Sequence, residues 1–252
     1  MYMRLVQATL KAEALPMLCQ LYEEKVIPSL QITKGCLHCS LLQSVSHPQE
    51  SVSLTLWSSR STADAYEASG PFSKLLEEAS QYFEGSSEWG LHLSSDLSLQ
   101  YDPVPEPPVV RTFDIPAERS SSILPRTPSS SVYIRIVTPQ IRHGKMEEFK
   151  KLFTEEVLPH IRAAAGCIHA SLIENVKQQG QLLSLNVWAS KQNADEYEHS
   201  GQFSALTKKV EHCFSEMYQW KKQIEQETHR RTVTSEEMTI DGYNVITGKT
   251  FL

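Results

Sequence analysis

The sequence lacks several features that would assign it to familiar functional classes. Its 252 residues contain no uninterrupted apolar run near the ~20 residues of a membrane-spanning helix, so no membrane association is expected. The net charge of −6 and the pI near 5.9 argue against a nucleic-acid partner, because phosphate binding requires clustered Lys and Arg. The five cysteines are an odd number and no secretory signal precedes them, which favours reduced thiols and a cytoplasmic location.

The usual catalytic motifs are also missing. We find no Gly-rich phosphate loop, no Ser-His-Asp ordering and no paired-carboxylate site. The spacing Cys36-x-x-Cys39 is typical of metal or redox sites, but no second such pair exists, and residues three apart on a regular strand point to opposite faces. We therefore expect no metal and no cofactor.

What the sequence does contain is a tandem duplication. The segment 26–38, with Val-x-Pro followed by Gly-Cys-x-His, recurs 131 residues later at 157–169. No gap is needed between Tyr2 and Trp89, and about a third of the paired positions are identical. Any account of fold or function must therefore apply to both repeats.

The repeats divide the chain into four predicted parts: a first domain at 1–101, a linker at 102–131, a second domain at 132–224 and a tail at 225–252. The linker holds seven of the thirteen prolines, which is typical of an extended connection, and residues 109–115 are predicted to form a short strand within it. In the tail, Asp241-Gly242 between apolar residues predicts a small hairpin.

Each repeat predicts the element order β-α-β-β-α-β, which is the ferredoxin-like arrangement of the α+β class. In the first repeat we expect strands near 2–10, 36–45, 52–57 and 89–93, and helices near 15–26 and 61–83. Pro28 and Pro159 are expected to end or kink the first helix. The second helix is expected to begin at Ser61 and to restart at Pro71.

Alternation along the third strand separates two faces. Val52 and Leu54 are predicted to pack under the helices, while Ser53 and Trp57 are predicted to face the interior of a two-sheet barrel. The residues of the second repeat that correspond to this polar and aromatic face are Ser184, Asn186 and Trp188. An interior with a few polar groups among aromatic walls suits a small planar ligand.

The ordered set of a proline-containing first helix, Gly-Cys at the second strand, Trp followed by Ala-Asp-x-Tyr, and Ser-Gly-x-Phe resembles the antibiotic biosynthesis monooxygenase domain family. The resemblance covers 2–93 and 132–222. It implies two ferredoxin-like units paired as a dimeric α+β barrel, here within one chain, with further homo-oligomerisation open. It also implies cofactor-independent oxidation of polycyclic aromatic phenols with O₂, or haem degradation.

The sequence departs from the family at the positions that carry these activities. Where quinone-forming members have an asparagine four residues before the strand-three tryptophan, this chain has Ser53 and Ser184. Their tyrosine six residues after that tryptophan falls on Ala63 and Ala194, and the axial histidine of the haem degraders falls on Leu76. Haem degradation is therefore not expected.

Two interpretations of the candidate site residues are open. In the first, histidines act as general bases that form a phenolate, and aromatic and polar residues bind the ligand. The proposed bases are His38 and His169, and the proposed ligand-binding residues are Arg4, Ser53, Trp57, Tyr66, Arg135, Ser184, Asn186, Trp188 and Tyr197. In the second, the same residues fill the interface between two sheets, and the arginines form internal ion pairs. The protein is then a binding or structural pseudo-dimer without turnover.

Overall fold

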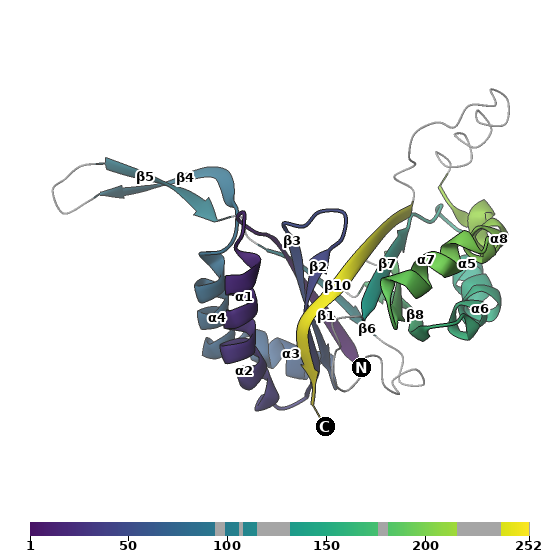
Figure 1. Ribbon diagram of the computed structural model, residues 1–252, viewed down its shortest axis with the longest axis horizontal. Coiled ribbons are helices and arrows are strands. Elements are labelled where there is room, and N and C mark those ends of the chain that lie inside the picture. Colours follow the sequence, from purple (N-terminus) through teal and green to yellow (C-terminus); the bar gives the residue numbers. More distant parts are fainter. Residues whose placement is uncertain (94–98, 106–107, 115–131, 176–180, 216–237, 252) are drawn as a thin grey trace. The chain divides into compact units, whose positions relative to one another are not determined.

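The structure is a computed structural model that describes residues 1–93, 99–105, 108–114, 132–175, 181–215 and 238–251 (Figure 1). The chain forms two compact units. The N-terminal unit comprises residues 2–111 and 246–252, and the C-terminal unit comprises residue 1 and residues 112–245. Trp220, the predicted loop at 177–180 and most of the predicted linker lie outside the described residues.

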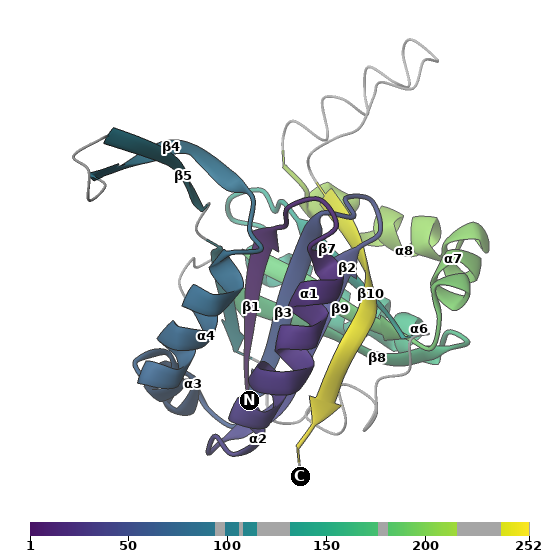
Figure 2. The ribbon, with the colours of Figure 1, turned by 60° about the vertical axis from the view of Figure 1, so that its left-hand side comes forward.

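The N-terminal unit is a small antiparallel sheet with helices on one of its faces (Figure 2). Its elements are β1 (Tyr2–Thr9), α1 (Leu15–Leu21), the π-helical turn η1 (Tyr22–Val26), α2 (Ile27–Gln31), β2 (Cys36–Ser44), β3 (Glu50–Trp57), α3 (Arg60–Glu67), α4 (Gly70–Ser80), β4 (Gly85–Leu93) and β5 (Leu99–Pro105). The strand order is β1-β3-β2, and the last residues of β10 lie beside β2. In this register Arg4 lies opposite Thr55, and Cys39 lies opposite Thr55 from the other side.

The C-terminal unit repeats this plan. Its elements are β6 (Val109–Asp114), β7 (Tyr133–Pro139), α5 (Met146–Leu152), the π-helical turn η3 (Phe153–Val157), α6 (Leu158–Ala163), β8 (Cys167–Asn175), β9 (Leu182–Trp188), α7 (Lys191–His199), α8 (Gln202–Val210), the 3₁₀ turn η4 (Glu211–Cys213) and β10 (Met238–Thr250). The strand order is β10-β7-β9-β8-β6. The core lies between this sheet and its helices, where Phe149, Trp188 and Phe214 pack together.

The predicted fold class is confirmed: the protein is α+β, and both repeats form ferredoxin-like units with the order β-α-β-β-α. The short strand expected at 109–115 is also confirmed as β6. None of the helices among the described residues is long and apolar enough to span a membrane.

The last strand of the first unit was predicted wrongly. The segment around 89–93 is a strand, β4, but it pairs with β5 in a separate two-stranded sheet instead of joining β1-β3-β2. Alternating residues identify a strand, yet they do not specify which neighbour it pairs with. This part of the topology therefore could not follow from the local pattern.

The predicted hairpin at Asp241-Gly242 is also wrong, because β10 runs without a break from Met238 to Thr250. Gly242 lies opposite Arg135 in the ladder with β7. A Cβ atom at this glycine would lie 1.8 Å from the Tyr133 hydroxyl oxygen. The glycine is required by the close approach of a tyrosine ring and not by a turn.

The first helix continues through its proline. A π-helical turn precedes Pro28, and the Ile27 amide donates to the Tyr22 carbonyl five residues earlier. Pro28 then stands in the first turn of α2, where its missing amide hydrogen costs little. The second repeat has the same turn at 153–157 before Pro159. The helix does not end at the prolines themselves but a few residues beyond them, at Gln31 and Ala163, and the π turn adjusts the hydrogen bonding before each proline.

The helix that follows β3 begins slightly earlier than predicted. Ser59, not Ser61, is the N-cap, and its hydroxyl accepts a hydrogen bond from the Thr62 amide at 3.3 Å. Ser190 caps α7 in the same way, accepting from the Asn193 amide at 3.2 Å. The restart at Pro71 is confirmed, because Pro71 lies in the first turn of α4.

Candidate functional site

The polar face of β3 points toward the helices, the reverse of its predicted orientation. Ser53, Thr55 and Trp57 line a cavity between the sheet and the helices, whereas Val52 and Leu54 are buried and do not line it. Alternation divides a strand into two sets of residues but does not say which set lies under the helices. Burial does not distinguish the set of residues that lies under the helices either, because both sets on β3 are largely buried.

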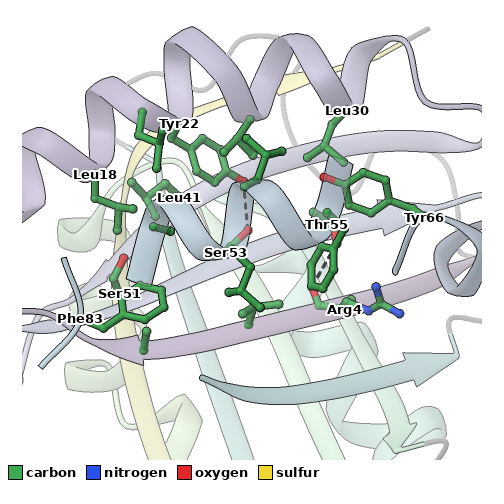
Figure 3. Close-up of a pocket in the computed structure, with 18 of the residues that line it drawn as sticks. Arg4, Leu18, Tyr22, Leu30, Leu41, Ser51, Ser53, Thr55, Tyr66 and Phe83 are labelled. Carbon is green, nitrogen blue, oxygen red and sulfur yellow. Dashed lines mark hydrogen bonds between the residues drawn. The ribbon is translucent and has the colours of Figure 1, made fainter. Parts of the chain in front are cut away.

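The cavity of the N-terminal unit has a volume of about 110 Å³. Figure 3 shows Tyr22 reaching from the π-helical turn toward the sheet, with Ser51 and Phe83 at one end of the cavity and Tyr66 and Arg4 at the other. Leucines from α1, α2 and α4, together with Val26 of η1, supply most of the remaining wall. The cavity is therefore mainly apolar, with a line of hydroxyl groups along its floor.

These hydroxyl groups are already engaged within the protein. The Ser51 hydroxyl donates to the Leu42 carbonyl at 3.0 Å. Ser53 and Tyr22 share a hydrogen bond of 3.2 Å between their hydroxyl oxygens. Because Ser51 has spent its proton on the backbone, it offers only lone pairs to the cavity.

The aromatic end is built by Trp57 and Tyr66, whose ring centroids lie 5.3 Å apart at an interplanar angle of 34°. Phe72 packs edge-on against Tyr66 at 5.6 Å. The Trp57 indole Nε1 donates to the Thr55 hydroxyl at 3.0 Å. These contacts hold both rings in place before any ligand arrives.

Arg4 forms an internal ion pair at this end, as one of the two interpretations predicted. Its NH2 nitrogen lies 2.5 Å from a Glu67 carboxylate oxygen and 3.7 Å from an Asp64 oxygen. The NH1 nitrogen donates to the Ala63 carbonyl at 3.4 Å, and Nε has no hydrogen-bond partner. The guanidinium is buried, while both carboxylates are partly exposed, so the pair fixes α3 against β1.

The residues that line this cavity include only three ionisable side chains, Arg4, Tyr22 and Tyr66. Burial raises the pKa of Tyr66 to about 12, although the Ser29 hydroxyl acts in the opposite direction. Burial also raises the pKa of Tyr22 well above its usual value. Both phenols stay protonated near neutral pH, so the cavity wall, as far as the described residues form it, holds no general base.

The predicted catalytic histidines do not line the cavities. His38 lies on the opposite face of the sheet, where its Nδ1 is 2.8 Å from the Thr250 hydroxyl and its Nε2 has no partner. Burial lowers the pKa of His38 to about 3, so this ring stays neutral at physiological pH. His169 is also buried and lies opposite Val187 of β9, outside the wall of the second cavity. The histidines and the ligand-binding candidates therefore occupy different faces.

The C-terminal unit has an equivalent but smaller cavity of about 50 Å³. Its wall includes all five ligand-binding candidates of the second repeat, namely Arg135, Ser184, Asn186, Trp188 and Tyr197. The aromatic end is preserved, with Trp188 and Tyr197 ring centroids 5.2 Å apart at 35°. Arg135 again pairs with two carboxylates, 3.1 Å from Glu198 and 3.7 Å from Asp195.

The polar groups of this second cavity are arranged differently. The Ser184 hydroxyl donates to the Asn186 side-chain oxygen at 3.4 Å, and the asparagine accepts no hydrogen bond from the indole as Thr55 does. Trp188 Nε1 and the Tyr197 hydroxyl are buried without hydrogen-bond partners. Burial raises the pKa of Tyr197 to about 12.

Sequence reasoning missed the wall residues that come from helices. Leu18 and Tyr22 lie on the buried, apolar side of α1 and η1, where the sequence pattern is the same as that of core residues. Ser51 precedes the predicted third strand, and Ala79 lies within the predicted second helix. Comparison of the two repeats could have pointed to these residues, because the side chains at three of the positions, Leu18, Ser51 and Ala79, differ in size from their counterparts in the second repeat.

The cysteine pair was also placed wrongly. A β-bulge between Cys36 and His38 puts Cys36 opposite Trp57 and Cys39 opposite Thr55, so both cysteines point to the helix face. Both thiols are free and buried, and burial raises the pKa of each to about 12. A high pKa keeps these thiols protonated, which is the opposite of what reactive redox cysteines need.

The sequence matches the model of one protein family, described as antibiotic biosynthesis monooxygenase, over residues 1–78 and again over residues 132–209. Together the two matches cover more than half of the chain. No match was found among curated protein sequences.

Several solved structures resemble the whole chain. A "Putative monooxygenase" from Fusobacterium nucleatum matches with a TM-score of 0.67 and 8% identity, over 99% of this chain and 94% of that one. A second protein of that description, from Lactobacillus acidophilus, matches with a TM-score of 0.61 and 9% identity, over 99% and 95%. An anthrone oxidase-like protein matches with a TM-score of 0.54 and 11% identity, over 99% and 92%. At these identities the likeness concerns the fold.

Proposed function

Because this chain belongs to the antibiotic biosynthesis monooxygenase family and carries two copies of its domain, we propose that the N-terminal cavity binds a small aromatic molecule with a hydroxyl group. The observation that carries this proposal is a cavity of about 110 Å³ with apolar walls and a floor of hydroxyl groups. An apolar cavity of ~150 Å³ binds benzene, so this smaller cavity admits at most a single ring. A polycyclic ligand would require the helices to move.

The hydrogen bonds of the floor favour a ligand that donates. The Ser51 proton is committed to the Leu42 carbonyl, so the serine oxygen can only accept from a ligand. A phenolic O–H meets this requirement, whereas a ketone or ether oxygen does not. Trp57 and Tyr66 offer ring surfaces for the apolar part of the same ligand.

Binding without turnover is the function that the site supports best. No base lines the cavity, and His38, with a pKa near 3, lies on the other face of the sheet. The asparagine and tyrosine used by quinone-forming relatives are replaced by Ser53 and Ala63.

Cofactor-independent oxidation is the second candidate, and the family membership and the likeness to an anthrone oxidase-like protein favour it. In this case the ligand has to be acidic enough to ionise without help. The phenolate would supply electrons to O₂, converting the ring C–H group opposite the hydroxyl to C=O and so giving a quinone, with one oxygen atom entering the product and the other leaving as water together with the two hydrogens lost from the phenol.

A panel of single-ring phenols with different pKa values tests both candidates. Calorimetry should detect binding of the phenols, and an oxygen electrode should detect consumption only with the most acidic ones if oxidation occurs. Ser51→Ala should weaken the binding of a phenol but not of the matching hydrocarbon, because only the hydroxyl acceptor is lost. Ser184→Ala, in the second repeat, serves as the control. If no phenol binds, or if Ser51→Ala weakens phenol and hydrocarbon equally, the proposal should be abandoned.

A further inference from the structure

A cluster of three potential metal ligands lies in the second repeat, outside both cavities. Glu148 belongs to α5, and His212 and Cys213 form most of the turn η4. The His212 Nε2 atom is 2.9 Å from a Glu148 carboxylate oxygen and 3.4 Å from the Cys213 sulfur. The three ligand atoms all lie within 4.8 Å of one another. We propose that Glu148, His212 and Cys213 bind one Zn²⁺ ion.

The donor set and its spacing fit this ion. Zinc prefers nitrogen, sulfur and carboxylate oxygen ligands at roughly 2.0–2.3 Å in a tetrahedral arrangement, which places neighbouring ligand atoms about 3.3–3.8 Å apart. The distances of 2.9 and 3.4 Å lie close to that range, so small side-chain rotations bring all three atoms onto the metal. Three protein ligands leave a fourth position for water.

The backbone holds the turn η4 in place. The Arg142 amide donates to the Cys213 carbonyl at 2.9 Å, and the Ser215 amide donates to the Gln140 carbonyl at 3.1 Å. Cys213 itself is fully buried, while Glu148 and His212 are exposed at the surface. A fixed sulfur with two adjustable surface ligands gives an ion an entry path and an ordered partner.

The charges around the cluster are compatible with a bound dication. Lys145 pairs at 2.5 Å with one carboxylate oxygen of Glu148 and leaves the other for His212 or the metal. The pKa of Cys213 is raised, first by burial and then by Glu148, although Lys145 and Arg142 act to lower it. On binding, Zn²⁺ replaces the thiol proton, which is released to solvent, and the thiolate and carboxylate then balance the charge of the ion.

The cluster is specific to the second repeat. The aligned positions of the first repeat are Met17, Gln81 and Tyr82, which offer no comparable set of ligands. A surface ion pair between His212 and Glu148 would explain those two residues, but it requires nothing of Cys213. The sulfur is therefore the group on which the test should depend.

The test uses the full chain without an affinity tag, stripped of metal by a chelator, and titrated with Zn²⁺ by calorimetry and with Co²⁺ by absorption spectroscopy. We expect one equivalent of metal and a near-ultraviolet thiolate-to-cobalt band. Cys213→Ser should abolish that band. Cys213→Ser and His212→Gln should each weaken Zn²⁺ binding at least about tenfold, because even the loss of a group that only hydrogen-bonds to a metal ligand costs ~10–100-fold.

Cys19→Ser is the matched control, because Cys19 lies 3.7 Å from the Glu23 carboxylate but has no histidine in this arrangement. It should leave the metal affinity and the cobalt band unchanged. His212 is exposed, so His212→Gln should fold even if the buried Cys213→Ser variant does not. Binding that survives both substitutions, or a cobalt spectrum without a thiolate band, would overturn the proposal.

Discussion

The two cavities are built from corresponding elements of the two repeats but differ about twofold in volume, which is roughly 110 Å³ in the first repeat and 50 Å³ in the second. Both repeats keep the arginine with its two carboxylates and the stacked tryptophan and tyrosine. Three aligned positions carry a larger side chain in the second repeat: Leu18 corresponds to Phe149, Ser51 to Leu182, and Ala79 to Val210. The ion pairs and aromatic contacts are therefore the same in both repeats, whereas the volume of the cavity differs. We infer that the first repeat is the one built to admit a ligand.

The largest expected effect is a loss of stability, and it tests a turn that both repeats share. Gly35 and Gly166 adopt φ angles of +86° and +77°, and an added Cβ would lie 2.7 Å from Thr62 or 2.3 Å from Asn193. Gly35→Ala and Gly166→Ala should each lower the free energy of unfolding by about 3 kcal/mol or more, because strain and overlap add. Denaturant unfolding measures this loss.

Gly70→Ala is the control for both glycine variants. Nothing lies within 4 Å of its added Cβ, and the residue is already helical. Its unfolding free energy should stay within about 0.5 kcal/mol of the wild type. If Gly35→Ala were equally neutral, the turn that the two repeats share would not require a glycine.

Lowering the pH should destabilise the folded protein through His38 of the N-terminal unit. Its pKa is about 3 in the folded protein, whereas an unfolded histidine has a pKa of ~6.5. The unfolded chain therefore binds the proton first, and stability falls as the pH drops through 6.5 toward 3. Between pH 8 and pH 5 this histidine should account for about 2 kcal/mol of lost stability.

Comparing wild type with His38→Asn in urea at both pH values isolates this contribution, because the other titrating groups are common to both proteins. The variant should lose about 2 kcal/mol less than wild type between those pH values. Identical pH dependence of wild type and His38→Asn would contradict the buried neutral ring.

Exchanging wall residues tests the difference in capacity directly. Ser51→Leu places in the first cavity the side chain that the second repeat has at Leu182, and it removes the hydroxyl acceptor. Phenol binding should weaken by more than about tenfold, which corresponds to ~1.4 kcal/mol. Calorimetry with the phenol that binds best provides the measurement, and retained affinity would show that the ligand lies elsewhere.

Much of the fold could be predicted because the repeat doubled each local signal. The residue type alone indicates the backbone conformation at positions such as Gly35 and Pro71, so a turn and a helix start could be predicted there from the sequence. The pairing of β4 and the unbroken run of β10 through Gly242 did not follow, because both depend on partners distant in the chain. Local chemistry specifies elements more strongly than it specifies their neighbours.

The candidate site was predicted in part for a similar reason. Arg4, Ser53, Trp57 and Tyr66 do line one cavity, since identity between the repeats and strand alternation placed them together. His38 does not, because alternation assigned a face to it only relative to its own strand. Helix residues such as Tyr22 look like core in any single sequence, and only the packed structure shows that space remains beside them.

The smallest expected effect concerns the two indole groups. Trp57 Nε1 donates to Thr55 at 3.0 Å, whereas Trp188 Nε1 is buried without a partner. Replacing either tryptophan by phenylalanine removes similar apolar surface, but only Trp57→Phe also loses a hydrogen bond. Trp57→Phe should therefore destabilise the protein by about 1 kcal/mol more than Trp188→Phe. A double-mutant cycle with Thr55→Val should recover this difference as coupling energy. Equal losses would mean that Trp188 has a partner of its own, such as an ordered water, and that the two cavities differ in size but not in polar satisfaction.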